Sequence, residues 1–377
     1  MRLHLFFLIL LAGSTCFAVN YSGPIGHREA FLANAGGGMA ESPGNVLLNP
    51  AGLGFRQNKE SSLTVSGNAI SRQEFNVSQY AVDPEEMSIR PLLAAGIYPT
   101  NYGTMAIFIS NPTSFKIYGG SSSSESGVNI KTLLRVDYEE LAAGMTWARE
   151  IHPHFSWGVS AGIGVETQKS YGYALASQTG VTAVTSFSLT EQKTVSLFIV
   201  PGVLFKATDH WNVGLSMKAL ADLSSSATTM RFRTNSSSPT TVEELNNSYD
   251  PNGTSPLSFR LGQEFIFSAN HDVYLDLIYQ GASSSYNANN EKFLTDEIWS
   301  GALGYRNSFS NDVETLWGYS YARSGSADSN SLTAGVALER RNNEFIFGLY
   351  YLSSVPREAD TGGFNSYGVM FSSNVEY

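Results

Sequence analysis

The chain has 377 residues, of which only 15% are charged, and it contains 35 glycines, 19 tyrosines and 22 phenylalanines. Soluble proteins carry about a quarter charged residues, so this composition favours a protein whose surface is partly apolar. The net charge of −10 and the lack of clustered Lys and Arg argue against a nucleic-acid partner. Mean hydropathy is −0.11, near neutral, as expected where lipid-facing and lumen-facing residues alternate.

The N-terminus predicts a signal peptide over residues 1–18. Arg2 provides the positive start, Leu5 to Ala12 form an apolar run, and Cys16-Phe17-Ala18 is a small-x-small cleavage site. The run is too short to span a bilayer as a helix. Lipid attachment at Cys16 is an alternative, but Gly13-Ser14-Thr15 is a poor lead-in for it. Because Cys16 is the sole cysteine, the mature chain is expected to form no disulfide and no thiol-based metal site.

Residues 19–60 lack the alternation of a strand, and we expect them to form a plug inside a barrel rather than to hang in the periplasm. Residues 33–41 are small and flexible, which suits close packing in a crowded lumen. Val46, Leu47, Leu48, Leu53 and Phe55 would be poorly served by solvent. A simpler alternative is that 44–51 is a structural turn leading into the first strand.

Residues 61–377 show apolar and polar residues alternating with period two, which predicts strands with one apolar face. Residues 155–166, 258–268 and 273–280 are clear examples. Short polar breaks alternate with longer ones, as in an up-and-down barrel. The short breaks lie near 99–103, 150–154, 207–210, 269–271, 307–311 and 340–343; the longer ones near 82–90, 119–131, 173–189, 224–255, 283–295, 323–329 and 355–363.

This rhythm predicts an all-β fold, a transmembrane antiparallel β-barrel of about fourteen strands in the outer membrane of a Gram-negative bacterium. The alternative is a large soluble β-sandwich or propeller. Tryptophans near predicted strand ends favour the barrel, because aromatic girdles lie at membrane interfaces: Trp157, Trp211, Trp299 and Trp317. The lipid of that membrane is therefore an expected partner.

The predicted inward rows contain apolar residues where an aqueous porin would carry charged ladders, which favours a hydrophobic ligand path. These candidate lumen residues are Phe198, Val200, Leu204, Ile266, Ile278, Leu316 and Met370. Pro201 lies within a predicted strand, where it removes a ladder hydrogen bond and is a candidate kink.

The motif Gly44-Asn45-Val46-x-x-Asn49-Pro50-Ala51 follows the Gly/Ala-rich run and precedes the first strand. It resembles the N-terminal hatch of the FadL/TodX-type long-chain fatty-acid transporters. The resemblance covers about a tenth of the chain and implies a fourteen-stranded barrel whose hatch plugs the lumen and which passes hydrophobic molecules inward. In that family a strand kink provides a lateral exit into the membrane. The terminal Tyr377 resembles the C-terminal signal read by the barrel-assembly machinery.

The resemblance implies hatch roles for Gly44, Asn45, Asn49, Pro50 and Ala51. Independently, Pro50 fixes its own φ and holds Asn49 extended, and Asn side chains can satisfy backbone groups of an irregular buried segment. We expect a channel for passive uptake of hydrophobic small molecules such as long-chain fatty acids. The alternative is a non-transport barrel that is structural or docks secreted proteins. No nucleophile elbow or phosphate loop is present, so we expect no enzyme activity, no cofactor and no metal.

Overall fold

Strand pairing closes into a ring in the computed structural model, which describes residues 23–56, 59–77, 80–81, 90–125, 128–178, 181–235, 238–249, 256–286, 292–310, 312–325, 327–357 and 363–377. Every pairing in the ring is antiparallel, and the last strand pairs with the first. The predicted signal peptide, 1–18, lies outside the described residues. Among the described residues, no helix is long and apolar enough to cross a membrane.

The wall of the barrel contains fourteen strands within the described residues, which confirms the predicted fold and strand number. In chain order they are β1 (Ser62–Val77), β3 (Arg90–Thr100), β4 (Gly103–Glu125), β5 (Val128–His152), β6 (Phe155–Gln178), β7 (Val181–Thr208), β8 (Trp211–Asn235), β10 (Ser258–Ser268), β11 (His271–Gln280), β14 (Ile298–Ser310), β15 (Val313–Arg323), β16 (Ala327–Arg340), β17 (Asn343–Pro356) and β18 (Gly363–Glu376).

Two of four further strand segments prolong this wall, and the other two form a hairpin of their own. β2 (Tyr80–Ala81) lies along the same edge of β1 as β3, and β9 (Ser238–Tyr249) lies along the same edge of β8 as β10. β12 (Ser283–Tyr286) and β13 (Lys292–Thr295) form a separate small hairpin between β11 and β14.

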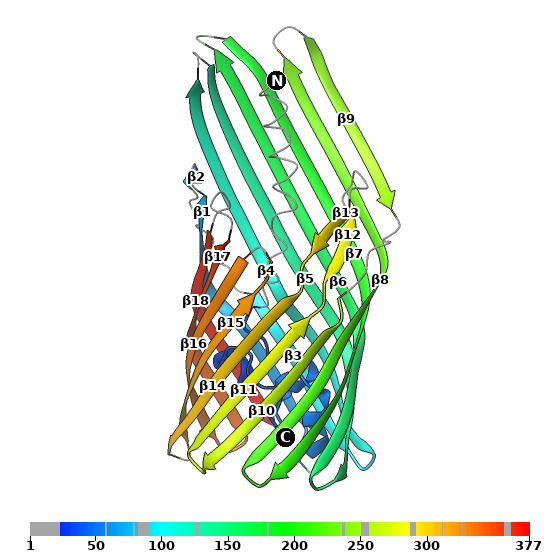
Figure 1. The fold of residues 1–377 in the computed structure, drawn as a ribbon, viewed down its shortest axis with the longest axis vertical. Coiled ribbons are helices and arrows are strands. Elements are labelled where there is room, and N and C mark those ends of the chain that lie inside the picture. The colour runs from blue at the N-terminus through cyan, green and yellow to red at the C-terminus, as the bar shows by residue number, and fades with distance from the viewer. Residues whose placement is uncertain are drawn as a thin grey trace.

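One side of the barrel is much taller than the other, a feature that the sequence did not predict (Figure 1). Pairing of β4 with β5 continues to Glu125↔Val128, and pairing of β6 with β7 continues to Gln178↔Val181. The predicted long loops at 119–131, 173–189 and 224–255 are therefore mostly strands. Their high content of Ser, Thr and Gly is typical of loops. However, a strand that extends beyond the membrane needs no continuous lipid-facing apolar row, so such residues can also form strands there.

The outer surface of the barrel carries an apolar band. On β6, outward residues from Trp157 to Val165 are apolar, and Ile163 is 49% exposed. Nine residues match the length that a tilted strand needs to cross the hydrocarbon. Trp157 and Trp211 lie at the short-turn end and Trp299 at the opposite end, each largely outward. Tyr377 is exposed and its N–H donates to the Ser61 carbonyl at 2.9 Å; recognition by the assembly machinery stays a prediction.

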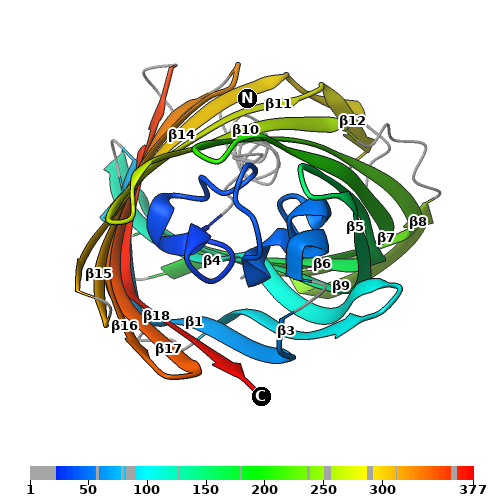
Figure 2. The same ribbon diagram turned by 90° about the horizontal axis from the view of Figure 1, so that it is seen from below.

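Residues 23–56 lie inside the ring (Figure 2) and near its short-turn end (Figure 1). They form three short 3-10 helices, η1 (Glu29–Leu32), η2 (Pro43–Val46) and η3 (Pro50–Arg56), joined by irregular backbone. Almost all of these residues are buried although the segment is too short to have its own core. The wall therefore provides the surface against which this segment, here called the plug, is packed.

Candidate functional site: the plug and its seat

Asn49 and Pro50 lie where two parts of the plug meet the wall. Asn49 is 1% exposed, and its Nδ2 donates to the Gly37 carbonyl at 2.7 Å and to the Val203 carbonyl of β7 at 3.2 Å. Its Oδ1 accepts the Ala51 N–H at 3.3 Å, and Pro50 begins η3. The amide side chain thus satisfies backbone groups of an irregular buried segment.

Gly44 and Asn45 lie within η2 and are also buried. Asn45 Nδ2 donates to the Met39 carbonyl at 2.8 Å and so bridges the segment before the helix. The Gly44 Cα packs against the Glu29 carboxylate so closely that a Cβ there would clash with it. All five predicted hatch positions therefore lie in one connected piece of the plug, and their part in gating stays a prediction.

Three serines on inward rows of the wall hold plug carbonyls. Ser156 and Ser160 of β6 donate to the carbonyls of Ala51 and Val46 at 2.6 and 2.7 Å, and Ser216 of β8 donates to that of Leu48 at 2.6 Å. A buried carbonyl without a partner is costly, so these hydroxyls replace the water that the carbonyls lose.

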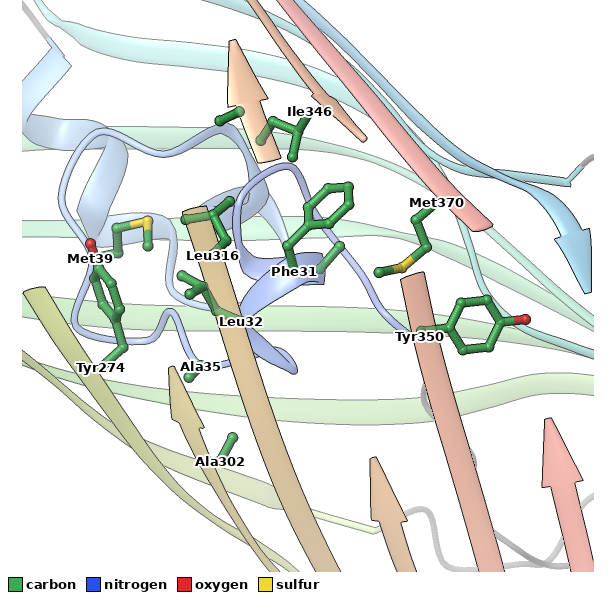
Figure 3. Packing of buried hydrophobic residues seen from close by; sticks show 12 residues of the cluster. Phe31, Leu32, Ala35, Met39, Tyr274, Ala302, Leu316, Ile346, Tyr350 and Met370 are labelled. Carbon is green, nitrogen blue, oxygen red and sulfur yellow. The ribbon is translucent and has the colours of Figure 1, made fainter. Parts of the chain in front are cut away.

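Apolar clusters join the plug to opposite sides of the wall. Phe31 and Leu32 of η1 pack with residues of β15, β17 and β18, including Leu316 and Met370 (Figure 3). Val46 and Leu53 pack with Phe198 and Val200, and Phe55 packs with Leu204. Of the candidate lumen residues, Phe198, Val200, Leu204, Leu316 and Met370 are thus seats for the plug. Ile266 and Ile278 are partly buried, and a ligand-lining role for the set stays a prediction.

A belt of glycines on the inner wall lets the plug backbone approach closely. A Cβ added to Gly214 of β8 or Gly262 of β10 would clash with Gly37 of the plug. A Cβ added to Gly318 of β15 would clash with Leu32 and Ala33 of the plug. The other members of this belt, on β6, β7, β14, β16 and β17, are Gly158, Gly202, Gly304, Gly335 and Gly348. Because glycine has no side chain, an inward glycine on successive strands creates a shelf for the plug.

Ion pairs fix the first part of the plug. Arg28 Nε lies 2.7 Å from Glu344 Oε1 and its Nη1 lies 3.1 Å from Glu314 Oε2. Burial alone would lower the pKa of the Arg28 guanidinium, but these two carboxylates raise it above its ordinary value, so the group stays charged. His27, 1% exposed, has Nε2 2.7 Å from Glu344 Oε2 and Nδ1 2.5 Å from Ser372 Oγ.

Asp276 of β11 is a second anchor and is fully buried. Its carboxylate accepts the N–H groups of Gly36 at 3.3 Å and Gly37 at 3.0 Å, and it lies 2.5 Å from Arg260 Nη1. The same Arg260 nitrogen donates to the Asn34 carbonyl at 2.8 Å. The strand-borne pair therefore binds both donors and acceptors of the 34–37 backbone.

The wall is irregular at Asn111 and Pro112 of β4. The register with β5 shifts by one residue between Ser110 and Thr113, and the Pro112 carbonyl accepts the Gly23 N–H at 3.2 Å. At Pro201 the β7–β8 ladder skips the pairs between Ile199↔Ala219 and Gly202↔Ser216 without a change of register. The strand irregularity that touches the beginning of the plug is thus the one at Pro112, which the sequence did not single out although Pro112 also falls in a strand.

The sequence analysis also did not predict the ion pairs that bind the plug, although the charged residues lie at inward-facing positions of the predicted strands. Arg260 and Asp276 belong to polar rows of the predicted strands, but the residues they bind lie more than 200 positions away. Within the described part of the chain, no group of three or more His, Cys, Asp or Glu could hold a metal ion.

No protein-family model matches the chain, and no curated protein matches it by sequence. Solved structures do match. The toluene transporter TbuX of Ralstonia pickettii has a TM-score of 0.66 at 14% identity, covering 95% of this chain and 100% of the other. The monoaromatic hydrocarbon channel CymD has a TM-score of 0.65 at 14% identity, covering 96% and 99%. A Pseudomonas aeruginosa FadL homologue has a TM-score of 0.58 at 12% identity, covering 93% and 98%. The chain thus has the fold of the FadL/TodX-type outer-membrane transporters, which its hatch motif resembles.

Proposed function

We propose that the protein is an outer-membrane channel for passive uptake of hydrophobic small molecules, in which residues 19–60 act as a movable hatch within the barrel of 61–377. The observation that carries the proposal is that the plug lies inside the barrel, where its contacts with the wall among the described residues are packing, hydrogen bonds and ion pairs. Such contacts can break and reform, so the plug can move without unfolding of the wall.

The wall irregularity at Pro112 supports a lateral route. Its carbonyl is held by Gly23, at the beginning of the described plug, so a displaced plug would also release the wall at that point. A molecule that leaves through a barrel wall enters lipid and must be hydrophobic. The structural neighbours include a toluene transporter and a monoaromatic hydrocarbon channel, so neutral aromatics join long-chain fatty acids as candidate substrates.

A reversible crosslink tests the movable hatch. The predicted mature chain contains no cysteine, so Ala33→Cys and Thr333→Cys can be introduced at a contact where Ala33 N lies 3.0 Å from Thr333 Oγ1. Uptake of radiolabelled oleate and of toluene would be measured in cells that lack other such channels. We expect uptake to be lost when the pair is oxidised and restored by reductant, with each single cysteine variant as control.

Two results would count against the proposal in different ways. Equal uptake by the oxidised and reduced forms would refute hatch movement but leave the channel intact. Uptake no faster than in cells with an empty vector, for both substrates, would refute the channel and favour the non-transport barrel.

A further inference from the structure

The tall side of the barrel extends well beyond the lipid-facing band. The apolar outward row of β6 ends at Val165, whereas the strand continues to Gln178. Lys169 is four residues beyond Val165, and Tyr173 is eight residues beyond Val165. At about 3.3 Å per residue and a tilt of about 40°, these side chains lie roughly 10 and 20 Å above the band.

The first rows above the band on the outer face are charged. Asp137, Lys169 and Glu191 are register partners on β5, β6 and β7, and Lys169 Nζ lies 3.1 Å from Glu191 Oε1. Lys193 lies one row closer to the band, in the same row as Glu139, and both residues are exposed. No ion pair of Lys193 is found among the described residues. This belt is at the height of lipid headgroups and contains both carboxylates and lysines, and Lys193 is the lysine that is left to bind a headgroup phosphate.

An aromatic and aliphatic patch lies above the charged belt. Leu133 and Tyr173 are register partners, 52% and 37% exposed. Arg135 lies 5.4 Å from the centroid of the Tyr171 ring, which holds that ring in place. Solvated sheet faces normally carry polar residues, so these exposed apolar side chains, which the charged belt separates from the lipid-facing band, indicate a bound partner.

We propose that this outer face of β5, β6 and β7 binds lipopolysaccharide, the phosphorylated glycolipid of the outer leaflet. Lys169 and Lys193 contact the phosphates just above the acyl chains, and Tyr171, Tyr173 and Leu133 contact the sugars of the core above them. Tyrosine combines an apolar ring with a polar hydroxyl and suits a sugar surface at an interface. The inference rests on insertion into the outer membrane, as in the proposed function, but not on transport.

Native mass spectrometry of the detergent-purified full barrel tests the inference. The protein would be titrated with rough lipopolysaccharide, which carries core sugars, and with lipid A, which lacks them. Each basic residue contributes roughly a factor of five at an anionic surface, so Lys169→Gln with Lys193→Gln should weaken binding of both lipids roughly tenfold or more. Leu133→Ser with Tyr173→Ser should remove only the preference for the core-bearing lipid.

Arg340→Gln, an exposed cation at the opposite end of the barrel, is the matched control and should leave binding unchanged. Heat-modifiable gel migration verifies that each variant is folded. Equal binding by wild type and the lysine variant overturns the inference. The inference is also overturned if the protein forms a dimer in lipid-free detergent and the double variant Leu133→Ser, Tyr173→Ser abolishes that dimer. This face would then bind a second copy of the chain. Neither result depends on whether hydrophobic molecules are taken up.

Discussion

Replacing Asp276 by alanine should release the first half of the plug. The fully buried carboxylate binds the N–H groups of Gly36 and Gly37 and pairs with Arg260. Removing one partner of a buried ion pair costs about 3–5 kcal/mol, because the other charge is left uncompensated. A loss of 3 kcal/mol corresponds to roughly a hundredfold rise in the population of the released state. The β10–β11 ladder is made of backbone bonds and should persist.

Two assays check this effect. In planar bilayers, the single-channel open fraction should rise for Asp276→Ala, and hydrogen exchange of residues 33–40 should accelerate by roughly two orders of magnitude. Asp276→Asn, which keeps an acceptor oxygen, should be intermediate. Asp328→Ala breaks an exposed pair with Arg357 at 2.7 Å and should change neither measurement, since such pairs contribute about 0–1 kcal/mol. Unchanged exchange of 33–40 in Asp276→Ala would show that this carboxylate does not anchor the plug.

Two further predictions concern the fit of the plug. Gly318→Ala places a Cβ against the plug backbone and should raise basal conductance. Gly301→Ala, on neighbouring β14, places its Cβ no closer than 3.8 Å to another atom and should leave conductance unchanged. Equal conductance of the two variants would contradict the close fit of the plug against the wall glycines. Glu29 is fully buried; its Oε2 accepts the His27 N–H at 3.0 Å, but its Oε1 has no hydrogen-bond partner among the described residues. Glu29→Gln should therefore lower the open fraction, because an amide is less costly to bury than a carboxyl group with an unsatisfied oxygen. Glu41→Gln, which alters an exposed pair with Lys59, is its control, and a higher open fraction in Glu29→Gln would refute the reasoning.

The barrel was predictable because the physics that forms it is local. Period-two alternation marks each membrane-crossing strand independently, and the short turns near 101, 153 and 209 lie where polar breaks indicated them. The tall wall was predicted as long loops because its strands are rich in Ser, Thr and Gly and lack the strict apolar–polar alternation of the membrane-crossing segments. The ion pairs between plug and wall could not be predicted from the sequence for another reason. Arg28 and Glu344 are 316 positions apart, and the closed barrel brings them together.

Asn49 provides the sharpest test of how the plug works as a unit. Its Nδ2 donates to the Gly37 carbonyl, and the Asp276 carboxylate accepts the Gly37 N–H, so the two side chains bind the backbone of one glycine. Asn49→Ala should therefore couple to Asp276→Ala in a double-mutant cycle by about 0.5–3 kcal/mol. Ser156→Ala removes a distant hydroxyl contact to Ala51 and should add to Asp276→Ala without coupling. If hydrogen exchange of the plug shows additivity in both cycles, the two halves move separately, and the Asn-Pro motif is a turn rather than the junction that links them to the wall.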